Sequence, residues 1–588
     1  MKILFFAPHA GIWSHAFPEA LIGQALQNNN HEIVYVTCEQ SFKNFCTVMA
    51  AFGYTNDTDK LQKQKACEQC QAYSKLIVSE FNFTHKAIKD YLDADDYRTC
   101  DNALSSITQD NLIDFKIDDI EIGRLTLYQI LLEYKKNTLQ FSTVEWQRVQ
   151  IDLYNALISF YATRKMLAQE QPEAVMVYNS LYSVNHIFSK LAEKNNIKQY
   201  FLHAGGNLAT RLETMILGES DGFKYYHHLL KKWHDFKHVP CTEKLIQKVS
   251  AHLLSVIQGS SIFSYSQGVS TAQVDIRAYF NIAPTQKLIL ATMSSNDERY
   301  AAGIVKAYKQ SNEVLFADQI SWLTEVIEYV KQRSDLFLLI RVHPREVPNR
   351  RESITSENYS KIVNLFKELP SNVKINWPED NISLYHLAQE TDLCLNSWSS
   401  AGKELSALGV PVLLYSAEIQ VYPPDINYVG ETREAYFGLW DKILSQGWDF
   451  ERIRKVFRWY AFEYFRTTLD LSDSFKITTS GKVNTYYKKI MRFMDSTFIQ
   501  KQDCHKRKLH LKVEPIINDI IENRHSSILD ILENLEIETI SLEEETHHLK
   551  NYIGKIFSVL MKNNTKETPV VRHFKKFMEA QEKHYVEG

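Results

Sequence analysis

The segment RVHPRE at residues 341–346 gathers two guanidinium groups and an imidazole within five residues. Arg and His side chains donate charge-assisted hydrogen bonds to carboxylates and phosphates, and proline restricts the backbone where the segment turns. Arg341, His343, Pro344 and Arg345 therefore form a candidate binding set for an anionic group. A surface turn with incidental charge is the alternative interpretation.

A second candidate lies in the segment NSWSSAGKE at residues 396–404. Ser399 and Ser400 stand at the predicted start of a helix, where hydroxyls and free backbone N–H groups can bind a phosphate. Gly402 leaves room for a ligand, and Glu404, one turn further on, can accept hydrogen bonds from ribose hydroxyls. Plain helix capping explains the same serines without a ligand.

A third polar loop holds Ser294 and Ser295, and all three loops follow apolar runs. The runs KLILAT, LFLLIRV, VKINW, LCLNS and VPVLLY alternate with helical patterns and predict five strands at 287–292, 336–342, 373–377, 393–397 and 410–415. Such an alternation is typical of a doubly wound parallel sheet. Because ligands of these sheets bind beyond the carboxyl ends of the strands, the three loops are expected to form one anion site.

A similar alternation opens the chain. Strands are predicted at 2–7, 32–38, 174–179 and 199–204, and a helix is predicted to begin at Pro18, since proline suits the first helical position. The stretch from about 60 to 170 is helical in pattern and predicts an insertion. The sequence therefore predicts an α/β fold in which two Rossmann-like domains face a cleft.

We expect an N-terminal domain at 1–275, which contains the insertion, a second domain at 276–480 and a helical C-terminal extension at 481–588. Apolar residues after Ser527 recur with helical spacing, which is typical of helices that pack on the chain itself. Pairing between two chains, or contact of the basic segment 501–512 with an anionic membrane surface, are the alternatives.

The first domain contains candidates for proton transfer. His15 and its rival His9 lie in the predicted loop before the first helix, and Glu19 lies in the first helical turn. A histidine of ordinary pKa can accept the proton of a hydroxyl nucleophile near neutral pH. A second group follows the strand at 199–204 and comprises His203, Gly205, Gly206 and Asn207. Helix capping, core packing and a tight turn are the structural alternatives for these residues.

Four cysteines of the first domain have the pattern C-x7-C-x20-C-x2-C: Cys38, Cys46, Cys67 and Cys70. Four thiolates can hold zinc tetrahedrally, and the C-x2-C half has the spacing of structural zinc sites. Buried free thiols are the alternative. No Asp-x-Asp pair follows a predicted strand, so no catalytic metal is expected.

Length and charge narrow the possible classes of protein. The 588 residues are too many for a single hydrophobic core. Lys and Arg number 67 against 71 Asp and Glu, a net charge of -4, so no general basic field is available and no nucleic-acid partner is expected. The chain lacks an apolar run of about 18 residues, and its start turns polar too early for a signal peptide, which predicts a cytoplasmic protein.

The segments RVHPRE, NWPEDNISLY and NSWSSAGKELSALGVPVLLY, together with HAGIWSHAFPEALIGQAL near the N-terminus, resemble bacterial surface-polysaccharide glycosyltransferases of GT-B architecture. Within that group they are most similar to capsule-synthesis proteins related to the Kdo transferases, which share a His-Pro motif and a serine motif with bacterial sialyltransferases. The resemblance covers about residues 1–440. It implies a nucleotide-sugar donor in the second domain, with His343 and Pro344 at the donor phosphate and Ser399 and Ser400 nearby.

The resemblance also directs attention to His15 as the base that activates an acceptor. It implies transfer of a sugar from a CMP- or UDP-linked donor to a surface glycan or a glycoprotein, in the cytoplasm or at the inner face of the membrane. The C-terminal helices are then expected to serve peripheral membrane contact or a homo-oligomer. A sugar-nucleotide epimerase or hydrolase of the same fold, and a non-catalytic scaffold for glycan assembly, are the alternative functions.

Overall fold

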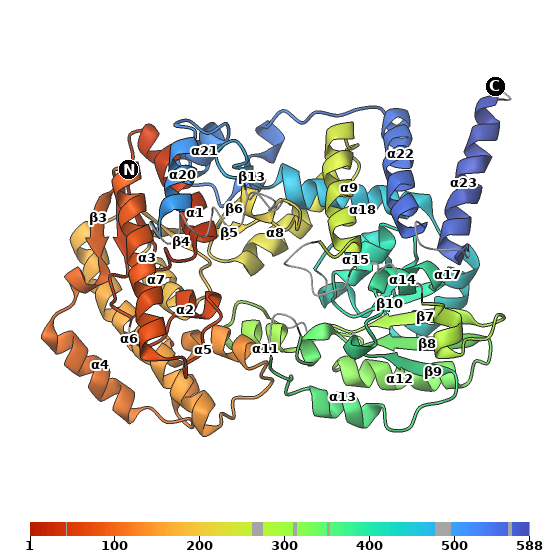
Figure 1. Cartoon of the computed structure of the whole chain (residues 1–588), viewed down its shortest axis with the longest axis horizontal. Helices are drawn as coiled ribbons and strands as arrows, with labels where there is room; N and C mark the ends of the chain where they lie inside the picture. The colour runs from red at the N-terminus through yellow and green to blue at the C-terminus, as the bar shows by residue number, and fades with distance from the viewer. Residues whose placement is uncertain are drawn as a thin grey trace.

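The computed structural model describes the chain except residues 43, 261–267, 269–273, 310–313, 350–352, 420, 477–494, 562–566 and 587–588. Figure 1 shows two sheets side by side, each surrounded by helices. The described helices include none with the length and apolar character needed to cross a bilayer.

The first sheet has the strand order β13-β6-β5-β4-β1-β2-β3. Its strands are β1 (Lys2–Phe6), β2 (Glu32–Thr37), β3 (Thr84–Ala87), β4 (Ala174–Tyr178), β5 (Lys198–Ala204), β6 (Thr214–Glu219) and β13 (Leu469–Asp470). β1 to β5 are parallel, whereas β6 and β13 pair antiparallel. The first six strands thus follow the order 3-2-1-4-5-6 of a Rossmann fold. The structure confirms the four predicted strands to within one residue at each end.

The helices of the first half are α1 (Trp13–Asn28), α2 (Thr47–Ala51), α3 (Lys60–Phe81), α4 (Ala94–Ser106), α5 (Ile122–Glu133), α6 (Thr143–Glu170), α7 (Ser183–Lys194), α8 (Gly222–Phe236) and α9 (Glu243–Ile257). The stretch from about 60 to 170 is mainly helical, as predicted, but it also contains β3, which extends the sheet beyond β2.

The predicted start of the first helix at Pro18 is wrong. α1 begins at Trp13, and Pro18 lies inside it. Proline removes one helical hydrogen bond at that point, but burial of Phe17, Leu21 and Ile22 stabilises the continuous helix. As a result, His15 lies in the first turn of α1 and not in a loop.

The second sheet has the order β12-β11-β10-β7-β8-β9, with all pairs parallel. Its strands are β7 (Lys287–Thr292), β8 (Leu336–Arg341), β9 (Val373–Asn376), β10 (Leu393–Asn396), β11 (Val412–Leu414) and β12 (Tyr428–Val429). The structure confirms the five predicted strands to within two residues at each end. This sheet also has the Rossmann order 3-2-1-4-5-6, and its order reverses between β7 and β10.

The helices around the second sheet are α10 (Ile276–Phe280), α11 (Asp297–Ile304), α12 (Gln319–Lys331), α13 (Tyr359–Leu365), α14 (Leu384–Glu390), α15 (Ala401–Ser406), α16 (Arg433–Gly438), α17 (Trp440–Gln446) and α18 (Phe450–Ala461). The chain therefore has two Rossmann-like domains, which is the GT-B architecture predicted from the sequence. After α18 and a π-helical turn, Phe462–Arg466, the chain returns to the first sheet as β13. The expected boundary at 480 lies outside the described residues.

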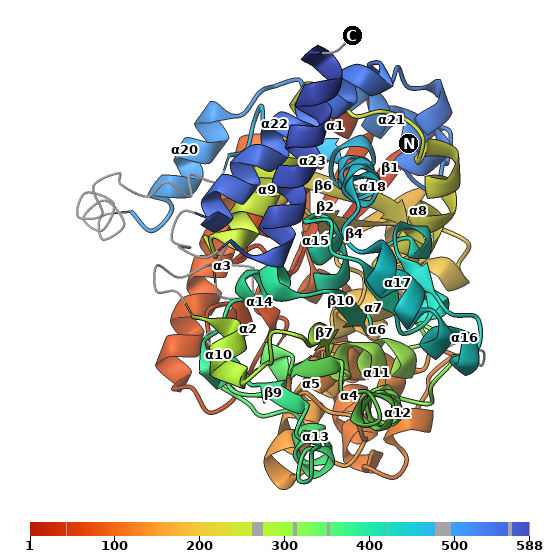
Figure 2. The same cartoon turned by 90° about the vertical axis from the view of Figure 1, so that its right-hand side faces the viewer.

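The described C-terminal helices are α20 (Phe498–Lys506), α21 (Glu514–Glu522), α22 (Leu542–Met561) and α23 (Pro569–Val586). α21 packs on α1 of the first domain, whereas α23 packs on α14 of the second. Figure 2 shows α22 and α23 side by side, and α22 packs on α9. The apolar stripe of α22, which includes Leu549, Ile553 and Phe557, is buried in the chain's own core.

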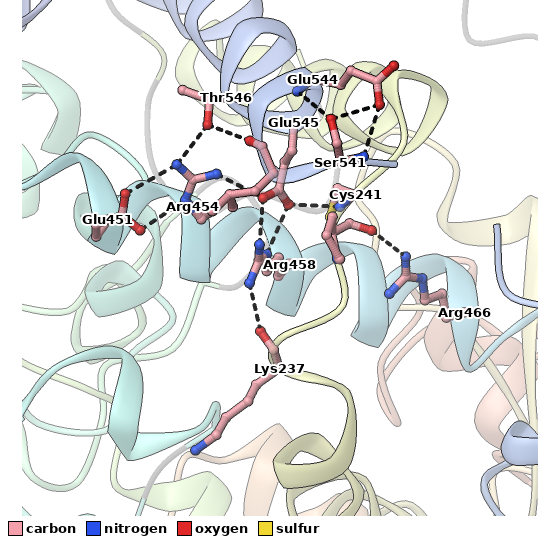
Figure 3. Close-up of polar contacts among 12 residues, drawn as sticks. Lys237, Cys241, Glu451, Arg454, Arg458, Arg466, Ser541, Glu544, Glu545 and Thr546 are labelled. Carbon is pink, nitrogen blue, oxygen red and sulfur yellow. Dashed lines mark hydrogen bonds and ion pairs between the residues drawn. The ribbon is translucent and has the colours of Figure 1, made fainter. Parts of the chain in front are cut away.

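A buried ion cluster attaches α22 to the rest of the molecule (Figure 3). The Glu545 side chain is fully buried and accepts hydrogen bonds from Arg454 and Arg458 of α18, at 2.9 and 2.6 Å. It also accepts one from the backbone N–H of Cys241, between α8 and α9. The C-terminal extension is thus fixed at a point where α9 and α18 meet.

Candidate functional site

A cavity of about 250 Å³ lies where the order of the second sheet reverses. From the second domain it is lined by Thr292, Met293, Arg341, Val342, His343, Pro344, Leu384, Ser399, Ser400, Ala401, Lys403 and Glu404. From the first half of the chain it is lined by Gly206, Leu208, His252 and Val256, and Tyr464 joins them from the π-helical turn after α18. The loops after β7, β8 and β10 therefore meet at one edge of the sheet, and the first half of the chain closes that edge.

His343 follows β8 and lies in the wall of the cavity. Its Nδ1 accepts a hydrogen bond from the backbone N–H of Arg345 at 3.2 Å. Burial lowers its pKa to about 3, and the charges of Arg345 and Arg341 lower it further. The imidazole is therefore neutral at physiological pH, and its proton sits on Nε2, which makes Nε2 a hydrogen-bond donor.

Arg341, the last residue of β8, supplies a positive charge. Its Nη1 donates to the Asn376 side chain and to the carbonyl of Ile382. Burial lowers its pKa to about 10, so the guanidinium remains charged at pH 7. A buried cation beside a neutral N–H donor suits an anionic ligand.

Ser399 and Ser400 contribute hydroxyls to the same cavity. Ser399 Oγ accepts a hydrogen bond from the Ala401 N–H at 3.2 Å, and Ser400 Oγ donates to Glu404 Oε1 at 2.9 Å. Tyr385 Oη donates to the other carboxylate oxygen of Glu404 at 2.8 Å. Since α15 is only six residues long, the side chains of this loop, more than a helix dipole, determine what it can bind.

Gly402 has a packing role that the sequence did not reveal. A Cβ atom at this position would lie 2.0 Å from the hydroxyl of Tyr422 and 2.6 Å from the Asn396 side chain. Gly402 does not line the cavity, so its small size serves the contact with Tyr422.

Three other predicted donor-site residues lie outside the cavity lining. Arg345 forms a buried ion pair with Asp297 at 2.8 Å and donates to the carbonyl of Leu132 at the end of α5. It therefore ties the two domains together. Ser294 and Ser295 are buried: the backbone of Ser294 exchanges hydrogen bonds with the Gln319 side chain, and Ser295 Oγ donates to a glutamate of α11.

His252, Lys403 and Tyr464 line the cavity although the sequence did not single them out. Lys403 Nζ forms a buried ion pair with Glu463 at 2.7 Å and lies 5.1 Å from the ring centroid of Tyr464. A Cβ at Gly206 would lie 2.4 Å from the Tyr464 ring, so Gly206 lets that ring close the cavity. Each of the three is a lone polar residue in a helical pattern, so the sequence gave no local signal for it. In the structure, Tyr464 lies in a π-helical turn, which is a feature often found at functional sites.

A second group of candidates meets at the corresponding edge of the first sheet, between β1 and β4. A small cavity there is lined by polar groups of His9, His15, Glu19, Tyr178, Tyr182 and Asn185. The His15 ring stacks on Tyr178, with centroids 4.2 Å apart and planes 12° apart. His203 lies near the same tyrosine at 6.2 Å, and His9 contacts Tyr182 edge-on at 5.8 Å.

Burial sets the protonation of this group. It lowers the pKa of His15 to about 3, with further lowering from His203, His9 and Arg211, and it raises the pKa of Glu19 to about 8. At pH 7 the imidazole of His15 is therefore neutral, but it is a much weaker base than the histidine of ordinary pKa that was expected from the sequence, whereas Glu19 is mostly in its acid form. The arrangement holds a neutral imidazole and a neutral carboxyl four residues apart on one helix.

The loop after β5 uses its other predicted residues for structure. A Cβ at Gly205 would lie 2.1 Å from Thr214 Oγ1. Asn207 is buried, and its Oδ1 accepts a hydrogen bond from the Ala209 N–H at 2.8 Å. His203 Nδ1 lies 2.9 Å from the carbonyl of Ala204. Gly206 alone of these four residues lines the interdomain cavity.

The expected zinc site at Cys38, Cys46, Cys67 and Cys70 is not formed. The four residues line a small cavity together, but the described residues contain no group of three or more His, Cys, Asp or Glu placed to hold a metal ion. Burial raises the pKa of Cys67 to about 11 and of Cys70 to about 12, so these thiols stay protonated at pH 7. Cys70 Sγ already accepts a hydrogen bond from the Gly11 N–H.

Neither the protein-family models nor the curated proteins include a match to this chain. Among solved structures, the chain is similar to the beta Kdo 2,4 transferase KpsC of Thermosulfurimonas dismutans, at 15% identity over 50% of this chain and 79% of that one, with a TM-score of 0.31. It is also similar to the UDP-GlcNAc 2-epimerase of Neisseria meningitidis, at 12% identity, 79% and 97% coverage and a TM-score of 0.22.

A third similar structure is the calicheamicin glycosyltransferase CalG4, at 11% identity, 84% and 98% coverage and a TM-score of 0.23. All three identities are low. The strand orders of the two sheets, and not these overall similarities, define the architecture of the chain.

Proposed function

We propose that the chain is a glycosyltransferase that moves a sugar from a nucleotide-sugar donor to a glycan acceptor. The observation that carries this proposal is the convergence of Arg341, His343 and Ser399 in one cavity, at the point where the second Rossmann order reverses. Nucleotides bind at such reversal points because loops from neighbouring strands diverge there and leave room for a ligand.

The donor phosphate is proposed to lie against Arg341 and the Nε2–H of His343. When the sugar leaves, negative charge grows on the phosphate oxygens, and donors already fixed in place stabilise it without having to reorganise. His343 is fixed by the backbone N–H of Arg345, and Arg341 by its bonds to β9 and the loop before α14. These side chains are therefore suited to offset the charge of the leaving group.

On the acceptor side, His15 is proposed to take the proton from the acceptor hydroxyl. The ring is neutral, it is oriented by stacking on Tyr178, and it lies at the edge of the first sheet that corresponds to the donor edge of the second. The donor is proposed to be a CMP- or UDP-linked sugar, and the acceptor a surface glycan or a glycoprotein in the cytoplasm.

The scarcity of acidic residues in the cavity lining favours transfer over epimerisation or hydrolysis. Either of those reactions needs acid and base groups beside the sugar. Glu404 is the one carboxylate among the described residues that line the cavity, and it is already bonded to Tyr385 and Ser400. No pair of free carboxylates is thus present among these lining residues.

The experiment is a binding screen with CMP, UDP, GDP and CDP on the full chain, by thermal shift and calorimetry. A nucleotide at 100 times its Kd should stabilise the protein by about 2.7 kcal/mol. His343→Ala should weaken binding about 10- to 100-fold, since it loses a hydrogen bond to a charged group. The control His386→Ala, on α14 and outside the cavity lining, should bind like the wild type.

The proposal fails if no nucleotide stabilises the wild type, or if both variants lose affinity equally. Measuring nucleotide release from the donor with and without a glycan acceptor then separates the enzyme classes. A transferase releases nucleotide faster when acceptor is present, whereas a hydrolase does not depend on it. A non-catalytic scaffold releases none from any donor.

A further inference from the structure

His252 lines the interdomain cavity but has no role in the donor site proposed above. It lies on α9, next to α18 (Figure 1), and its side chain is 3% exposed. It lines the interdomain cavity together with Val256, one turn further along α9, and with His343 of the second domain. A polar ring in such a place requires hydrogen-bond partners.

One nitrogen of His252 has a fixed partner. The backbone N–H of Leu208 donates to Nδ1 at 3.1 Å. Because a backbone amide can only donate there, Nδ1 is the unprotonated nitrogen of a neutral ring, and the proton sits on Nε2. Burial lowers the pKa of His252 to about 3, and the nearby charge of Lys403 lowers it further. The ring therefore stays neutral at physiological pH.

The Nε2–H of His252 has no acceptor among the described residues, although the ring lines the cavity. This nitrogen is not one of the fully enclosed polar atoms that lack a partner, and the ring lines the cavity. A ligand in the cavity can therefore reach Nε2. A donor held without a protein acceptor in a cavity lining is suited to bind a ligand oxygen.

His252 and His343 are held in the same way. In each ring a backbone N–H donates to Nδ1 and leaves Nε2 protonated. His252 lies on α9 and His343 lies in the loop after β8, so the two rings come from separate parts of the chain. Together with the charge of Arg341, the cavity presents N–H donors from two parts of the chain, which fits a group with several acceptor oxygens, such as a phosphate.

We propose that His252 donates its Nε2–H to a phosphate oxygen of the bound donor, together with His343, so that both parts of the chain hold the donor. This inference rests on the proposed function, since that function names the donor. The competing explanation is purely structural: His252 would only anchor the loop of Leu208 through Nδ1.

Two amide substitutions separate these explanations. In His252→Asn, the amide oxygen reaches the place of Nδ1 and can still accept from Leu208, but nothing replaces Nε2–H. In His252→Gln, the amide nitrogen reaches the place of Nε2 and donates, but the acceptor for Leu208 is lost. The two variants therefore keep opposite halves of the imidazole.

Calorimetry with UDP and CMP on the full-length wild type and both variants gives the test. We expect the Asn variant to bind about 10- to 100-fold more weakly than wild type and the Gln variant to stay within about threefold. The reverse pattern, equal affinities in all three proteins, or an equal loss in both variants would each overturn the proposal.

Pyrophosphate serves as a second probe, because it carries the anion without nucleoside or sugar. If the wild type binds pyrophosphate with the expected variant pattern but no nucleotide, the proposed function fails and the anion contact of His252 stands. If the wild type binds nucleotide and neither variant differs, the function stands and the His252 contact is refuted. Binding of neither probe refutes both.

Discussion

Glu19 offers a quantitative test of the first domain's electrostatics. Its side chain, in the second turn of α1, is 2% exposed. Tyr35 Oη donates to Oε2 at 3.4 Å, and Oε1 has no partner among the described residues. Burial therefore raises the pKa of this carboxyl from about 4.5 to about 8. Replacing it with glutamine keeps the shape and removes the ionisation.

The sign and the size of the pH effect on the free energy of unfolding follow from proton linkage. The native state binds the Glu19 proton more tightly than the unfolded state, so the stabilising effect is complete below about pH 4.5 and is lost as pH rises towards 8. Each tenfold difference in proton affinity is worth about 1.4 kcal/mol. Between pH 5 and pH 8 the wild type should therefore lose about 3 kcal/mol that Glu19→Gln does not lose.

Urea unfolding at pH 5 and pH 8 measures this difference. The stability of Glu19→Gln relative to wild type should rise by about 3 kcal/mol between the two pH values. Glu68→Gln, at an exposed position on α3, is the control and should show no such rise. If the stability of Glu19→Gln relative to wild type is the same at both pH values, or is greater at pH 5, Glu19 is not a buried neutral acid.

Three further outcomes are expected. His15→Ala should lower the transfer rate about 100-fold in single-turnover assays while nucleotide affinity in calorimetry stays unchanged, as expected for a lost base; an unchanged rate would place the base elsewhere. Glu545→Gln removes the carboxylate that pairs with buried Arg458 and one of the two that pair with buried Arg454, so it should cost about 3 to 5 kcal/mol in denaturant unfolding, whereas the exposed neighbour Glu543→Gln should stay within about 0.5 kcal/mol; equal effects would contradict this. Gly206→Val should abolish nucleotide binding by displacing Tyr464, and retained affinity would show that the ring does not shape the cavity.

Much of the fold could be predicted because its central strands are buried on both faces. Such strands read as unbroken apolar runs, and all residues of β10 are buried. The start of α1 was missed because Pro18 gave a strong local signal for a helix start, whereas the preceding turn depends on distant contacts, such as those of Trp13 with Tyr73 and Asp503. β13 was missed because an edge strand of two residues has little pattern of its own.

The site was predicted where one loop carries its own chemistry. Arg341, His343 and Ser399 lie at strand ends, and parallel topology alone brings strand ends together. Arg345 has the same residue type as Arg341, but its partner Asp297 is the first residue of α11, and spacing along the chain cannot reveal that pairing. His252 stands alone in a helical pattern, so the sequence gave no sign that α9 reaches the cavity.

The proposed function requires that the cavity between the two domains binds the phosphate of a nucleotide-sugar donor. A crystal structure of the full chain with UDP or CMP at saturating concentration tests it most directly. We expect phosphate density within hydrogen-bond distance of Arg341 and His343 Nε2, next to the loop of Ser399. Nucleotide bound elsewhere, or an empty cavity at a concentration that saturates binding in solution, would contradict it.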